Sequence, residues 1–155
     1  MKPYQFPVLF GLFLLTSCGP KVVFEETKTF EQEVWAYDDI ARFDFQVEDT
    51  SAYYDVWVAI SHNANYPYQN MYTNILTAYP NQADAKQLLS FEMATKGGQW
   101  YGKCSDEICQ LYIPLQERVQ FTVPGDYQLG FEQYNRKDSL WGIQSFTLKI
   151  QESKE

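Results

Sequence analysis

The sequence predicts an all-β domain, folded as a two-sheet antiparallel sandwich of immunoglobulin-like or jelly-roll-like type with about eight strands. Tyr and Phe are unusually frequent, at 12 and 11 of 155 residues, and aromatic and β-branched residues favour half-buried, pleated surfaces. Short apolar segments recur about every eight to twelve residues between turn residues, as in sandwiches. No amphipathic helix of useful length competes, and the length suits one domain.

Residues 1–17 have the form of a lipoprotein signal peptide. Lys2 supplies the basic n-region, an apolar h-region runs from Val8 to Leu15, and Leu15-Thr16-Ser17-Cys18 is a lipobox. An h-region of roughly eight residues is far shorter than the roughly 20 needed to span a bilayer. We therefore expect Cys18 to begin the mature chain and to carry its acyl chains, palmitate among them. The alternatives are an ordinary secretory signal with a chance cysteine, or a short buried helix.

The remaining chain divides into a tether and a domain. Residues 18–30 are expected to be a lipidated tether with a possible first strand, and residues 31–155 a single sandwich domain. Residues 34–42 mix aromatic and acidic residues, and Phe43–Val47 then alternates apolar with polar residues, which predicts a one-sided strand. The strand Tyr54–Ile60 has one face fully apolar and the other partly so, and it is predicted to be central.

Turn residues separate the later segments. Residues 61–70 are predicted to form a turn before the segment 71–79, and residues 80–84 a loop. Residues 86–95 are predicted to be a strand, with a short helix over 83–89 as the competing interpretation. The last strands are expected at 111–115, 119–123, 127–131 and 140–151.

Two cysteines remain after acylation, Cys104 and Cys109. In an exported domain an even number of cysteines is normally paired. The four intervening residues would form a hairpin loop, which places the cysteines opposite each other and makes a disulfide geometrically reasonable. Free thiols remain an alternative, and a metal site would need more ligands than two thiols and the distant His62.

The charge limits the class of partner. Residues 1–17 hold one basic residue and no acidic one, so the mature chain has 11 Lys and Arg against 20 Asp and Glu, a formal charge of −9. A chain this acidic is a poor candidate for nucleic acid or for a basic membrane-binding patch.

The sequence contains no recognisable catalytic constellation. His62 is the only imidazole, and we interpret it as a solvated or hydrogen-bonded loop residue, because adjacent Ser61 would point to the opposite face of a strand. The acidic residues Asp38, Asp39, Asp44 and Asp49 have no calcium-loop spacing, so a solvated acidic face is favoured over a glycosidase pair or calcium ligands. We predict no enzyme activity, no cofactor and no metal.

One aromatic loop is a candidate surface. Tyr66, Pro67, Tyr68 and Tyr72 crowd residues 65–72, and tyrosines present rigid amphipathic area to a protein partner or a sugar. They also fill sandwich corners for structural reasons, and both interpretations stay open.

Several motifs together resemble the gliding-motility lipoprotein family H (GldH) of the Bacteroidetes. They are the lipobox, the run Asn65–Tyr72, the Trp-x-Gly at Trp100–Gly102 and a C-terminal pattern. That pattern is made by Pro124, Gly125, Tyr127, Gln133, Arg136, Leu140, Gly142 and Ile143. The resemblance covers nearly the whole mature chain, but the cysteine pair is not part of it.

The resemblance implies a cell-envelope lipoprotein held by its lipid anchor. Gly19 after the cysteine, rather than Asp, matches outer-membrane sorting in enteric bacteria, so we expect the outer membrane. The resemblance also implies an accessory or structural component of the gliding motility and type IX secretion machinery that acts by protein–protein contacts, with no enzyme activity. The alternative function is a carbohydrate- or surface-ligand-binding envelope lipoprotein, which a long aromatic groove would favour.

Overall fold

The computed structural model describes residues 19–154 and confirms the all-β sandwich. The described strands are β1 (Val22–Thr29), β2 (Val34–Ala36), β3 (Ala41–Val47), β4 (Tyr54–Asn63), β5 (Asn70–Ala78), β6 (Ala85–Glu92), β7 (Lys103–Ser105), β8 (Ile108–Val119), β9 (Gly125–Gln133), β10 (Ser139–Trp141) and β11 (Ile143–Glu152). A 3-10 turn, η1 (Glu31–Glu33), follows β1. The expected signal peptide and Cys18 lie outside the described residues.

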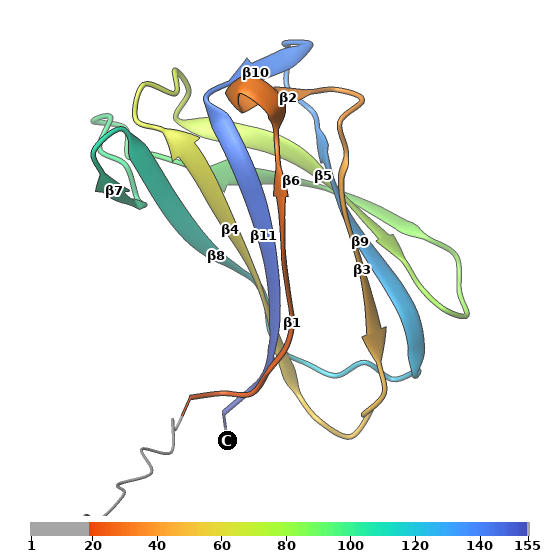
Figure 1. Cartoon of the computed structure of the whole chain (residues 1–155). Coiled ribbons are helices and arrows are strands. Elements are labelled where there is room, and N and C mark those ends of the chain that lie inside the picture. Colours follow the sequence, from red (N-terminus) through yellow and green to blue (C-terminus); the bar gives the residue numbers. More distant parts are fainter. Residues whose placement is uncertain (1–18, 155) are drawn as a thin grey trace, which may run out of the picture.

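Two antiparallel sheets form the sandwich. One has the strand order β1-β11-β4-β8-β7 and the other β3-β9-β5-β6, while β10 and β2 form a small third sheet at one end (Figure 1). The chain crosses repeatedly from one sheet to the other, so β4 pairs with β11 and β3 with β9, strands that are far apart in the sequence.

The core lies between the two large sheets. Their inward positions carry apolar side chains at every second residue, as period-2 alternation requires. Phe131 of β9 and Phe146 of β11 meet across the core with ring centroids 5.2 Å apart, and both are fully buried. Trp35 of β2 covers the end of this core, 4.7 Å from the Phe146 ring, and its indole nitrogen donates to the Asp39 carbonyl at 2.7 Å.

The strand count of about eight was too low, for two local reasons. Residues 140–151 are not one strand, because Gly142 adopts a φ of +91° between β10 and β11, a conformation that favours glycine. The short strands β2 and β7 have three residues each, too few for a periodic signal. The strand predicted over 86–95 is confirmed as β6, and the competing helix is wrong.

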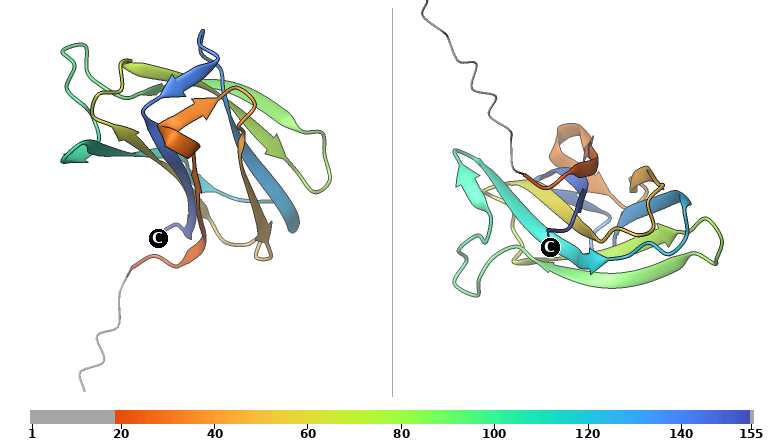
Figure 2. Two further views of the ribbon diagram at one scale, coloured as in Figure 1. Left: turned by 45° about the horizontal axis from the view of Figure 1, so that its top comes forward. Right: turned by 90° about the horizontal axis from the view of Figure 1, so that it is seen from below.

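Different strands and loops lie at the two ends of the sandwich. The start of β1 and the end of β11 lie together at one end, which we call the tether pole: Glu152 donates its backbone N–H to the Lys21 carbonyl at 2.9 Å, and the two side chains form an ion pair. The β7–β8 hairpin, the small sheet and the loop after β4 lie at the other end, the distal pole (Figure 2). No helix among residues 19–154 is long and apolar enough to cross a membrane.

Candidate functional site

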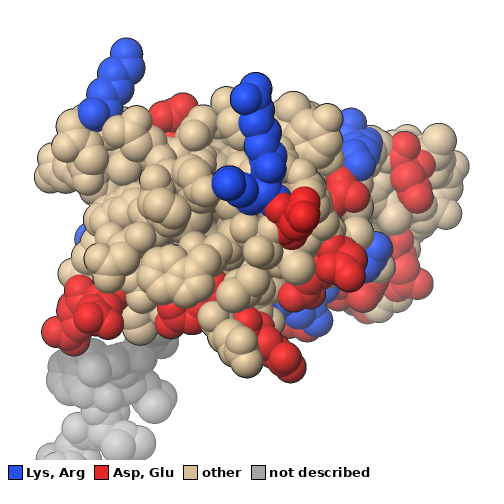
Figure 3. All heavy atoms as spheres, turned by 90° about the horizontal axis from the view of Figure 1, so that it is seen from above, with Lys and Arg blue, Asp and Glu red and all other residues tan. Residues whose placement is uncertain are grey.

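The distal pole exposes a group of large aromatic side chains. We call it the aromatic patch, and its members are Tyr37, Tyr68, Tyr72, Tyr101, Tyr134 and Trp141, which are 38–57% exposed. Figure 3 looks down on this pole and shows uncharged side chains over most of its left half, with charged side chains gathered toward the centre, the right and the rim. Exposed aromatic side chains are enriched at protein–protein interfaces, so this pole is the candidate interaction surface.

Strand alternation explains why members in or directly after a strand are outside, whereas Tyr37, Tyr68 and Tyr101 lie in turns and loops. Leu140 is buried and Trp141 is exposed, and the same alternation separates Gln133 from Tyr134. Sequence reasoning found Tyr68 and Tyr72 but missed the other four members. For Tyr134 and Trp141 the available signal was an aromatic residue at the polar phase of an alternating strand, next to a turn. Tyr37 and Tyr101 lie in turns or loops, where alternation gives no signal.

Asn135 holds two members of the patch in place. Its side-chain amide donates to the Tyr72 carbonyl at 3.0 Å, and its side-chain oxygen accepts from the Tyr72 N–H at 3.1 Å. Tyr37 donates its hydroxyl to the Asn135 carbonyl. The backbone N–H of Asn135 donates in turn to the buried Gln133 side chain at 2.7 Å. The backbone of Tyr72 and the side chain of Tyr37 are thus fixed to the end of β9, which lowers the ordering that a partner must impose on them.

The structure places some residues of the predicted loop surface outside and one of them in the core. Pro67, Tyr68 and Tyr72 are exposed, whereas Tyr66 is only 3% exposed. Tyr66 as a surface contact is therefore wrong: its ring turns inward to lie 5.5 Å from Tyr68 and 5.9 Å from His62. Burial raises the pKa of its hydroxyl.

The interpretation of His62 as a loop residue is also wrong. It lies in β4, which continues to Asn63, and it is fully buried. Its Nδ1 lies 3.0 Å from the Asn63 carbonyl and its ring packs 4.6 Å from that of Trp100. Burial lowers the pKa of the imidazole. Among residues 19–154 it has no hydrogen bond to a serine, a thiol or a carboxylate of the kind that catalysis would require.

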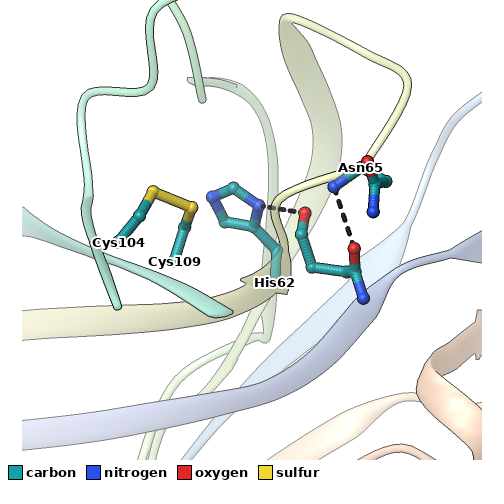
Figure 4. The surroundings of a disulfide bond; sticks show 5 residues. His62, Asn65, Cys104 and Cys109 are labelled. Carbon is teal, nitrogen blue, oxygen red and sulfur yellow. Dashed lines mark hydrogen bonds between the residues drawn. A yellow bond between two sulfur atoms is a disulfide. The ribbon is translucent and has the colours of Figure 1, made fainter. Parts of the chain in front are cut away.

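A disulfide joins Cys104 of β7 to Cys109 of β8 beside this histidine (Figure 4). The two residues are register partners, as are Ser105 and Ile108, so only Asp106 and Glu107 form the turn. Cys109 is fully buried against β4, where it is the register partner of His62, whereas Cys104 is exposed. The bridge thereby ties the short outer strand β7 to the sheet.

The acidic residues singled out in the sequence stay apart. Asp44 accepts a hydrogen bond from Gln128 at 2.6 Å. Asp49 accepts from the Ser51 hydroxyl, which lowers the Asp49 pKa. Asp38 and Asp39 follow β2, and burial followed by the neighbouring charge of Asp38 raises the pKa of Asp39. Among residues 19–154, no three His, Cys, Asp or Glu side chains are grouped closely enough to hold a metal ion.

A family model and two relatives all match this chain to the same lipoprotein family. The family model described as GldH lipoprotein matches residues 22–150. The chain is 24% identical over 155 residues to the gliding motility lipoprotein GldH homolog of Christiangramia forsetii, covering 96% of this chain and 94% of that protein. It is 27% identical over 152 residues to the gliding motility lipoprotein GldH of Flavobacterium johnsoniae, covering 94% of each. No solved structure matches the chain.

Proposed function

Because the chain belongs to the GldH lipoprotein family, we propose that it is an accessory or structural component of the gliding motility and type IX secretion machinery. It is anchored by its lipid in the outer membrane and acts by protein–protein contacts, without enzyme activity. Its relatives are named gliding motility lipoproteins, and this is not a known enzyme family.

The observation that carries the proposal is the opposition of the two poles. Gly19 follows the lipobox cysteine directly, and the described chain enters the sandwich at the tether pole (Figure 1). The aromatic patch lies at the other end of the sandwich. An anchor at one end and a binding surface at the other suit a lipoprotein that presents its patch to partners away from the bilayer.

The residue types of the patch favour a protein partner. Tyr and Trp are enriched at interface hot spots, since they bury large area with few rotatable bonds. The patch members project from separate loops and strand ends rather than along one groove. This arrangement favours a protein contact over the carbohydrate-binding alternative.

The test is co-purification from native envelopes. The variant Tyr101→Ser, Tyr134→Ser, Trp141→Ser removes three exposed aromatics of the patch. The matched control Tyr53→Ser, Tyr112→Ser removes exposed tyrosines elsewhere, 46% and 59% exposed. We expect the patch variant to lose the gliding and secretion proteins that co-purify with the wild type, while the control retains them.

Both variants should melt close to the wild type, because exposed substitutions usually change stability by within about 0.5 kcal/mol each. A patch variant that is folded and lipidated and still recovers every wild-type partner would contradict the proposal. Loss of the same partners in the control would contradict the assignment to the distal pole.

A further inference from the structure

We propose that the free edge of β6, together with the cleft beside it, binds an extended uncharged segment of a partner polypeptide as an added strand. The site lies in the half of the sandwich nearer the tether pole, separate from the aromatic patch. It therefore does not depend on the proposed function of that patch.

The two long sides of the sandwich differ. On one side β1 and β3 pack against each other, with the rings of Phe24 and Phe45 5.6 Å apart. On the other side β6 and the lower part of β8 are not hydrogen-bonded to each other. The view from below in Figure 2 places β8 and β6 on the same side of the molecule. A cleft of about 450 Å³ opens between them.

Between its terminal charges, Lys86 and Glu92, the edge of β6 lacks the features that normally protect an edge strand. β1 carries Glu25, Glu26 and Lys28 and has an irregular register at its start. β8 contains Pro114 and bulges against β4. β6 pairs regularly with β5 along its length, contains no proline, and is uncharged from Gln87 to Ser90. Unprotected edges of this kind are templates for strand addition.

Hydrogen bonds identify the backbone groups that face outward. Met93, just after β6, donates its N–H to the Gln69 carbonyl at 2.8 Å. Antiparallel pairing alternates, so the odd-numbered residues of β6 bond to β5. The N–H and C=O groups of Lys86, Leu88 and Ser90 then point away from β5, and no strand within residues 19–154 pairs with them. Leu88 is at the centre of this edge and is 50% exposed.

The cleft supplies room for side chains of the added strand. Its β6 wall is formed by Gln87 and Leu89 and its β8 wall by Leu115 and Val119, with Phe121 and Tyr127 among the remaining lining residues. Toward the distal pole the cleft closes, because Phe91 and Leu111 are buried. A strand added to β6 would direct every second side chain into this cleft. In strand addition generally, the backbone hydrogen bonds supply the affinity and such side-chain pockets supply the specificity.

The charges of the cleft define the chemistry of the segment. None of its described lining residues is Asp, Glu, Lys or Arg, in a chain of which 21% is charged. A charged side chain entering the cleft would lose its hydration and gain no counter-ion. The segment must therefore be extended, and uncharged at the positions that face inward.

A synthetic peptide tests the inference on the mature lipoprotein in nanodiscs. The probe is a fluorescein-labelled seven-residue peptide that alternates Thr and Val. Its partner probe carries N-methyl groups on consecutive residues throughout, so that neither of its edges can pair as a strand. We expect saturable fluorescence anisotropy with the first peptide and none with the second.

Two variants locate the site. Leu88→Pro removes an outward N–H without removing a bond to β5 and should weaken binding at least about tenfold. Its matched control Leu88→Val keeps the N–H and should bind within about twofold of wild type. Ala85 is an exposed residue that lines the cleft, so Ala85→Trp should fill the cleft and weaken binding. This variant still tests the site if Leu88→Pro does not fold.

Absence of saturable binding to the wild type would overturn the proposal. So would equal binding of the N-methylated peptide, or unchanged binding by folded Leu88→Pro and Ala85→Trp variants. Binding of an uncharged oligosaccharide such as maltohexaose in the cleft, without the peptide, would assign the site to a sugar instead. A dimer that Leu88→Pro dissolves would assign the edge to a second copy of this chain.

Discussion

At the scale of single residues, two polar groups beneath the aromatic patch are buried without a partner. The Nε2 of His62 and the hydroxyl of Tyr66 have no hydrogen-bond partner among the described residues. Both side chains lie in one aromatic cluster with Trp100. Buried polar groups without partners cost free energy, so this cluster should be sensitive to protonation and to substitution.

The first prediction concerns pH. Burial holds the pKa of His62 below its ordinary value of 6.5, so the unfolded chain binds a proton at a higher pH than the folded one. Stability is therefore unaffected by this group above about pH 6.5 and falls as the pH is lowered below that value, by at most about 1.4 kcal/mol per pH unit. Urea unfolding between pH 7.5 and 5 measures the slope.

The control for this prediction is His62→Gln, which should lose that slope. Asp49, Asp55 and Glu132 also have shifted pKa values, but these are lowered below 3.8, 3.8 and 4.5. Carboxylates with lowered pKa values contribute stability that is lost only at more acidic pH. An unchanged slope between pH 6.5 and 5 in His62→Gln would assign the effect to another group.

The second prediction separates two neighbouring tyrosines. Tyr66 is 3% exposed and Tyr68 is 38% exposed. Tyr66→Ala should lower the free energy of unfolding by about 3 kcal/mol, because it opens a cavity, while Tyr68→Ala should change it by less than about 1 kcal/mol. Tyr66→Phe removes only the unpaired hydroxyl and should be neutral or stabilising. Equal melting temperatures for both alanine variants would show that Tyr66 is not a core residue.

At the scale of elements, sequence periodicity predicted the strands that carry one apolar face. Phe43–Val47, Tyr54–Ile60 and the region of β11 appear where alternation placed them. Sequence periodicity failed where the conformation of one residue ends a strand. At Gly142, a positive φ divides the predicted last strand into β10 and β11. It also failed for His62, because a polar residue at the end of an apolar strand gives no sign that neighbouring loops will cover it.

The hairpin β7–β8 carries the third prediction. Cys104 and Cys109 should be recovered as a disulfide with no free thiol, and mass spectrometry after alkylation without reduction decides this. Cys104→Ser with Cys109→Ser should lower stability by about 2 kcal/mol or less, because the bridge closes a loop with a sequence separation of only 5. Alkylation of both residues in freshly isolated, unreduced protein would exclude the bridge.

At the scale of the whole molecule, the sequence alone did not predict which strands pair with each other or which segments meet at each pole. Alternation shows which face of a strand is buried, but it does not show which strand is its neighbour. The pairing of β4 with β11 joins residues that are 81 apart at Ile143 opposite His62 and 98 apart at Glu152 opposite Tyr54, and only packing of the complete core selects it. Gathering Tyr37, Tyr101, Tyr134 and Trp141 at one pole depends on that selection.

The last prediction tests the anchor on which the two-pole arrangement depends. Cys18 is the last lipobox residue, and the described chain begins one residue later at the tether pole. Two or more acyl chains on one cysteine are sufficient for stable membrane attachment. Cys18→Ser should therefore move the protein to the soluble fraction or leave it uncleaved, whereas Cys104→Ser with Cys109→Ser should remain with membranes. A Cys18→Ser protein that fractionates with membranes at the wild-type mature mass would rule out lipid anchoring, and the aromatic patch would then need another means of being held at the envelope.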